Sequence, residues 1–181
     1  ATEPNPALST WLALTRPLTA LSSPSFVQLE PLICLWRETR GALTGDVDAA
    51  LRAGRISQRM VLLRRQAPSS RLVFERIGGG FAHIRPCEGM LAIGRGFDEV
   101  PDRHYGARQG EAYMETGRSR SIRIESVRAL VSTSDGALLN TRYDRVLLPW
   151  RDRNDQFVMG VSLLRELTIW RGDRWVPFRS G

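Results

Sequence analysis

Residues 121–170 read SIRIESVRALVSTSDGALLNTRYDRVLLPWRDRNDQFVMGVSLLRELTIW. Apolar and β-branched runs alternate here with short polar turns, a pattern typical of consecutive strands joined by hairpins. Ser134-Asp135-Gly136 favours a tight turn because Asp-Gly accepts the positive φ that such turns require, and Arg153-Asn154-Asp155 supplies the next turn. The three antiparallel strands that we predict are Ile122–Ser132, Leu139–Trp150 and Phe157–Trp170.

Two more strands are predicted upstream of this stretch. Met60-Val61-Leu62-Leu63 favours a buried strand, and Arg71–Ile77 shows the alternation of a second one, with a turn at Pro68-Ser69-Ser70. Glycines and prolines then interrupt the chain up to Pro101, which favours short helical turns. Residues 102–116 follow as a longer helix, and Asp102 is its predicted N-cap.

The N-terminal part is predicted to be helical. Residues 25–40 carry an apolar stripe at helical spacing, and Ser25 and Gln28 have the spacing of a capping box. Residues 46–53 predict a second short helix. We expect residues 1–24 to form a terminal arm with a helical turn at Trp11–Leu14, residues 25–170 to form the domain, and residues 171–181 to form a short tail.

Composition points to one globular domain. The chain has 181 residues and a formal net charge of +7, and all 26 basic residues are Arg, since Lys does not occur. Phosphate contacts use Lys as readily as Arg, so the lack of Lys indicates a coding bias and argues against a nucleic-acid partner. No apolar run is long enough to span a membrane and no signal peptide is seen, which predicts a cytoplasmic protein. Cys34 and Cys87 are predicted to be reduced, buried thiols.

One family resemblance is carried by residues near the end of the chain. Tyr143-Asp144-Arg145-Val146-Leu147-Leu148-Pro149-Trp150, followed by a polar turn and the apolar strand that ends at Val161, resembles a pattern in small stand-alone bacterial proteins of the PAS superfamily. In that family an early helix carries a Leu-Trp-x-x-x-Arg stretch, which Leu35-Trp36-Arg37-Glu38-Thr39-Arg40 resembles. The likeness covers roughly residues 26–166.

The resemblance implies an α+β fold: a PAS-like five-stranded antiparallel sheet, with short helices on one face and an N-terminal flanking helix. It implies a sensory or regulatory module that binds a small ligand or mediates protein–protein contacts in signalling, rather than an enzyme. It also suggests a homodimer through the N-terminal helix. The cofactor, if any, is unknown. The ligand-binding candidates that flank the expected cavity are Met90, Phe97, His104, Tyr113, Tyr143 and Met159.

Two alternatives remain open. An enzyme of the cone-shaped α+β barrel type would need a His–Asp pair, which here means His104 with Asp102 or Asp144. A binder of nucleic acid or of a phosphate-bearing ligand would use residues 52–76, where seven arginines face a single acid, Glu75. A solvated basic face is the simpler interpretation of that stretch.

Overall fold

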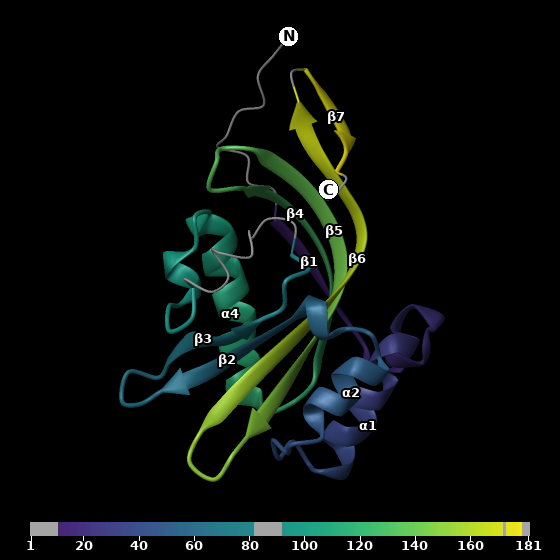
Figure 1. Ribbon diagram of the computed structural model, residues 1–181, viewed down its shortest axis with the longest axis vertical. Helices are drawn as coiled ribbons and strands as arrows, with labels where there is room; N and C mark the ends of the chain where they lie inside the picture. The colour runs from purple at the N-terminus through teal and green to yellow at the C-terminus, as the bar shows by residue number, and fades with distance from the viewer. Residues whose placement is uncertain (1–10, 82–91, 172, 179–181) are drawn as a thin grey trace.

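The computed structural model describes residues 11–81, 92–171 and 173–178. These residues form an α+β architecture in which three α-helices pack on one antiparallel sheet of seven strands (Figure 1). The strands are β1 (Trp11–Arg16), β2 (Met60–Gln66), β3 (Arg71–Ile77), β4 (Arg123–Ser132), β5 (Leu138–Arg151), β6 (Gln156–Arg171) and β7 (Arg174–Pro177). The helices are α1 (Glu30–Glu38), α2 (Val47–Ala53) and α4 (Arg103–Ser119), with 3-10 turns η1 (Leu18–Ser22), η2 (Pro24–Leu29), η3 (Ser57–Arg59) and η4 (Phe97–Glu99).

The predicted meander of residues 121–170 is confirmed. Strands β4, β5 and β6 lie close to their predicted bounds and pair antiparallel in succession. Gly136 closes the first hairpin with a φ of +81°, a conformation that glycine adopts without a steric penalty. The predicted strands at Met60–Leu63 and Arg71–Ile77 are also confirmed as β2 and β3.

All of these strands belong to one sheet. Its order is β1-β4-β5-β6-β2-β3, and β7 pairs with the end of β6. The early hairpin joins the late meander because β2 lies antiparallel to β6, with Met60 opposite Val161. The longest strands therefore stand at the centre of the sheet.

The sheet has seven strands rather than the five predicted. Residues 11–16, predicted to include a helical turn, form β1, which pairs with β4. Residues 174–177, in the predicted tail, form β7 and pair with β6. Both segments satisfy backbone groups that would otherwise be left at an open strand edge. Each segment becomes a strand because the fold places it beside a partner strand. The local sequence pattern therefore did not reveal these two strands.

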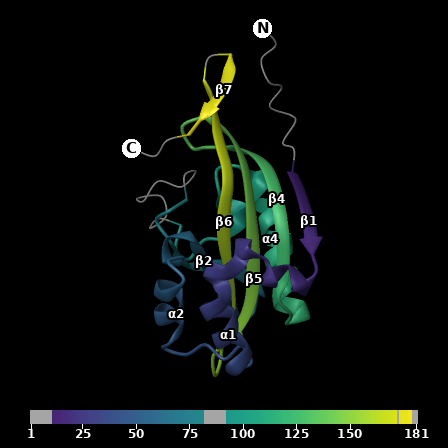
Figure 2. The same cartoon turned by 90° about the vertical axis from the view of Figure 1, so that its right-hand side faces the viewer.

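Helices cover both faces of the sheet (Figures 1 and 2), whereas the prediction placed short helices on one face and an N-terminal helix at the flank of the sheet. Helices α1 and α2 pack on the face that presents Leu148 and Met159, and α4 packs on the opposite face, which presents Leu147 and Val158. Successive side chains of a strand point to opposite faces. The nearly continuous apolar runs of β5 and β6 are therefore buried on both sides.

The predicted helix over residues 25–40 begins later than expected. A 3-10 turn occupies Pro24–Leu29, and the α-helix starts only at Glu30. The residue that caps this 3-10 turn is Ser23 rather than Ser25. Its side chain accepts a hydrogen bond from the Ser25 amide at 3.4 Å. Pro31 stands in the first turn of α1, where its missing N–H leaves no hydrogen bond unmade. The second predicted helix is confirmed as α2.

Candidate functional site

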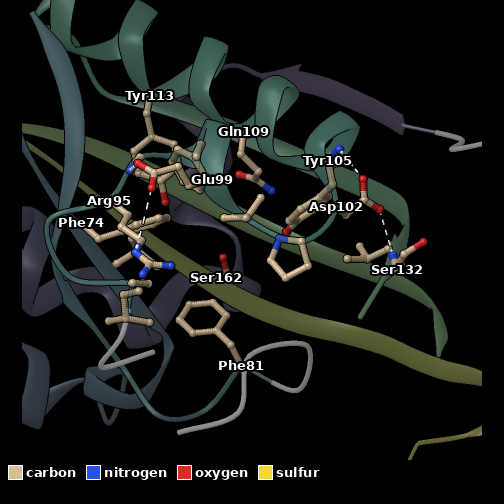
Figure 3. Close-up of a pocket in the computed structure, with 18 of the residues that line it drawn as sticks. Phe74, Phe81, Arg95, Glu99, Asp102, Tyr105, Gln109, Tyr113, Ser132 and Ser162 are labelled. Carbon is tan, nitrogen blue, oxygen red and sulfur yellow. Dashed lines mark hydrogen bonds and ion pairs between the residues drawn. The ribbon is translucent and has the colours of Figure 1, made fainter. Parts of the chain in front are cut away.

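A cavity of about 230 Å³ lies between α4 and the face of the sheet that α4 covers (Figure 3). Its wall combines side chains from strands, from α4 and from the segment that contains η4. The lining residues are Val61, Phe74, Ile77, Phe81, Ala92, Arg95, Gly96, Phe97, Glu99, Val100, Pro101, Asp102, Tyr105, Gln109, Tyr113, Val131, Ser132, Tyr143 and Ser162. The cavity is larger than the roughly 150 Å³ apolar cavity that is known to hold benzene.

Asp102 fixes the start of α4 above this cavity. One oxygen of its carboxylate accepts a hydrogen bond from the Tyr105 amide at 2.9 Å, which confirms the predicted N-cap. The other oxygen accepts from the Ser132 amide, also at 2.9 Å. Because Ser132 is the last residue of β4, this one side chain joins the helix to the sheet (Figure 3).

Two glycines allow α4 to approach its neighbours closely. A Cβ atom at Gly106 would lie 2.1 Å from the carbonyl oxygen of Phe97, and one at Gly160 would lie 1.8 Å from the hydroxyl of Tyr113. Neither separation is possible for real atoms. The missing side chains therefore let η4 pack against α4 and let the Tyr113 ring lie on β6.

One end of the cavity is aromatic. The Phe97 ring lies 4.8 Å from the Phe74 ring in an edge-to-face arrangement and 5.1 Å from the Tyr113 ring, measured between centroids. Such contacts stabilise ring pairs by about 0.5–1.5 kcal/mol beyond the burial of their area. This end of the cavity offers ring faces and edges to an apolar group.

The other end is polar and centres on the Tyr143 hydroxyl. Gln109 donates to it from Nε2 at 2.5 Å, and the Tyr105 hydroxyl lies 3.1 Å from it. The orientation of the Gln109 amide is determined by its second partner, because Oε1 accepts from Arg145, which has only donors. The phenols and the amide thus form one connected network beside the cavity.

Behind this network lies a buried ion pair between Arg145 of β5 and Glu125 of β4. Both side chains are 1% exposed. Arg145 Nε donates to Glu125 Oε2 at 2.7 Å, and Nη2 lies 2.6 Å from the same oxygen without a well-directed hydrogen bond. The rings of Trp11 and Tyr113 lie 5.5 Å and 5.8 Å from the guanidinium. Arg123 also donates to Glu125, at 2.7 Å, so the carboxylate has two cationic partners.

The protonation of these groups follows from their burial. Burial raises the pKa of Tyr105, Tyr113 and Tyr143 above the ordinary value of a phenol. The charge of Arg145 opposes this rise at each site, but it does not cancel it. Burial by itself lowers the pKa of Arg145, and Tyr143 and Glu125 raise it to a net value above the ordinary one. The polar end of the site therefore holds neutral phenols beside the charged guanidinium of Arg145.

Sequence reasoning did not select Glu125 or Arg145 as site residues. A signal was nevertheless present, because each is a charged residue at an inward position of a strand face that is otherwise mostly apolar. Glu125 alternates with Val127 and Ala129, and Arg145 stands between the inward positions of Tyr143 and Leu147. A charge in such a position needs a buried partner.

The six residues selected from the sequence are not all at the cavity. Phe97, Tyr113 and Tyr143 line it. His104 is exposed on α4, and Met159 is buried on the opposite face of the sheet, against the N-terminal helices. Met159 lies there because residues of even and odd number on β6 point to opposite faces. Met90 lies outside the described residues.

The His–Asp pair considered for an enzyme is not assembled. His104 is exposed, and both oxygens of Asp102 accept backbone hydrogen bonds. Asp144 accepts from Ser126 at 2.6 Å and from Arg165 at 2.8 Å. Within the described ranges, no group of three or more His, Cys, Asp or Glu residues could hold a metal ion.

Three of the seven arginines in the basic stretch of residues 52–76 pair with acidic side chains that the structure describes. Arg64 pairs with Glu75 at 3.0 Å. Arg71 pairs with Asp98 and Glu99, and Arg76 pairs with Asp48.

Cys34, predicted to be buried, is exposed because it lies on the outer side of α1, and Cys87 lies outside the described residues. In the described part of the chain, no helix combines the length and the apolar character needed to cross a membrane.

Comparison with known proteins returned no match: no family model, curated protein or solved structure is similar to this chain. The site must therefore be interpreted from its own geometry.

Proposed function

We propose that this chain is a PAS-like sensory or regulatory module that binds a small organic ligand between α4 and the sheet. The observation that carries the proposal is the cavity of about 230 Å³, which has an aromatic end and a polar end. Pockets for small molecules are mostly apolar and contain a few placed polar groups that orient the ligand.

The arrangement of elements also supports the PAS-like interpretation. Two early strands and a three-stranded meander form one sheet, and the segment between them contributes η4 and α4 to the cavity wall. This is the order of elements that the resemblance implied. Asp102 ties α4 to the end of β4, so a ligand that displaces α4 would also act on the sheet. Signalling would follow from a shift in the population of such states.

The test begins with native mass spectrometry and an absorbance scan of the freshly purified protein. We expect a bound small molecule, or stabilisation of the empty protein by small aromatic compounds in a thermal unfolding assay. A Ser162→Phe variant places a ring at the cavity wall and should abolish both signals. Arg128→Phe, which adds the same ring at an exposed position of β4, should preserve them. Binding that is unchanged in Ser162→Phe would contradict the proposal.

A further inference from the structure

Arg59 differs from the other arginines of the basic stretch. It ends η3, directly before β2, and its side chain is half-buried. It forms no ion pair with any described residue, whereas Arg64, Arg71 and Arg76 each have an acidic partner. Burial lowers the pKa of Arg59, because it takes part of the guanidinium charge out of water.

Arg59 lines a second, smaller cavity that adjoins the main one. This cavity measures about 30 Å³, which is large enough to hold a water molecule. The two cavities share Phe81, Tyr105, Tyr143 and Ser162 as lining residues. A ligand whose body fills the main cavity can therefore extend a small headgroup toward Arg59.

Several hydrogen-bond donors line the headgroup position. Besides Arg59, the small cavity is lined by Ser162 and Thr141, whose hydroxyls form no hydrogen bond with any described residue. Among the described residues, no Asp or Glu lines it. The acids of the main cavity are engaged elsewhere, since Glu99 pairs with Arg71 and Asp102 caps α4.

These features identify a class of ligand, on the basis of the function proposed above. We propose that the ligand is a small aromatic carboxylate: its ring lies in the main cavity near Phe97, and its carboxylate lies between Arg59 and the Ser162 and Thr141 hydroxyls. A guanidinium matches the geometry of a carboxylate, and the negative charge of the carboxylate compensates the positive charge of the guanidinium. The aromatic end of the main cavity matches the ring.

Phenylacetate and phenylacetamide test this inference, because they share size and shape but differ in charge. Isothermal titration calorimetry with the wild-type protein should show phenylacetate binding at least about tenfold more tightly, as expected for a charge-assisted hydrogen bond. Arg59→Met should remove this preference and leave phenylacetamide binding intact. Arg59→Lys should retain part of the preference.

Arg52→Met is the matched control. It removes the same charge from an exposed position at the end of α2, so the preference for phenylacetate should persist. Equal affinities for the two compounds, with no effect of Arg59→Met, would overturn the carboxylate inference but not the ligand-binding function. If neither compound binds and the purified protein carries no small molecule, the proposed function itself fails.

Discussion

At the scale of single residues, the Glu125–Arg145 pair shows how unequal two partners of one ion pair can be. Glu125 is held by Arg145 and by Arg123, which is 24% exposed. Arg145 has Glu125 as its one acidic partner among the described residues; its other side-chain partner, Gln109, is neutral. Removing the carboxylate therefore leaves a buried charge uncompensated, whereas removing the guanidinium does not.

Glu125→Gln should destabilise the protein by about 3–5 kcal/mol, the usual cost of breaking a buried ion pair from one side. Arg145→Met should cost less, because Glu125 keeps its bond to Arg123. The double variant should cost less than the sum of the two single changes. Urea unfolding monitored by circular dichroism measures all three free energies. Equal costs for the single variants would contradict this account of the pair.

The phenols give a prediction about pH. All three tyrosines of the chain line the cavity, so the phenolate absorbance of the folded protein reports on this site alone. Burial raises the pKa of each phenol in the folded state, so above pH ~10 the unfolded chain binds fewer protons than the folded one. The contribution of the phenols to the free energy of unfolding should be fully present below this pH, and it should be lost as the pH rises further.

Spectrophotometric titration should therefore show phenolate forming in the folded protein above the midpoint that the urea-unfolded chain shows near pH 10. The urea midpoint should decrease over the same range. A folded-state titration that coincides with that of the unfolded chain would show that the phenols are in contact with water.

At the scale of elements, helix α4 can pack closely against η4 because Gly106 has no side chain. Gly106→Ala would bring a methyl group against the Phe97 carbonyl and force η4 away from α4, at a cost of about 1–3 kcal/mol. Gly110 is the matched control in the same helix. A Cβ there would lie 3.5 Å from the nearest atom of Phe97, an ordinary contact.

Gly110→Ala should stabilise the protein by about 0.5–1 kcal/mol, because alanine loses less backbone entropy in a helix. Thermal unfolding of both variants provides the comparison. Because Phe97 lines the cavity, Gly106→Ala should also weaken binding of phenylacetamide. Similar melting temperatures for the two variants would refute the close approach of α4 and η4.

The elements also show how far local pattern reaches. Strands β2 to β6 and the N-cap of α4 were predicted because alternation, Asp-Gly turns and capping residues act over a few neighbouring positions. The helix of residues 25–40 was predicted with a wrong start, because Ser25 and Gln28 have the spacing of a capping box although the chain forms a 3-10 turn there. Met159 was wrongly assigned to the cavity, because the sequence does not show which face of β6 the helix α4 covers.

At the scale of the whole molecule, the homodimer through the N-terminal helix stays a prediction. Two tryptophans of the N-terminal part are engaged within the chain: Trp11 packs on Tyr105, and Trp36 donates to the Pro149 carbonyl at 2.6 Å. Apolar surface remains on the segment before α1, where Leu18 is 55% exposed and Val27 is 60% exposed. A second copy of the chain would cover such residues.

Cys34 reports on a dimer through the N-terminal helix because it is exposed on α1. If the dimer forms there, alkylation of Cys34, followed by peptide mass spectrometry, should slow as the protein concentration rises. Val27→Glu should remove this dependence by placing a charge in the contact. A constant alkylation rate together with a monomeric mass at every concentration would exclude the dimer.

The sequence alone determined the meander, the early hairpin and the cap of the long helix, because hydrophobic period, turn chemistry and capping are local properties of the chain. Only the tertiary structure decided that residues 11–16 and 174–177 are strands, that helices cover both faces, and that Glu125 meets Arg145 beneath Tyr143. Strand edges, buried charges and cavities are completed by partners that are distant in the sequence. The cavity and its adjoining arginine therefore became visible only once β2, α4 and the meander were brought together.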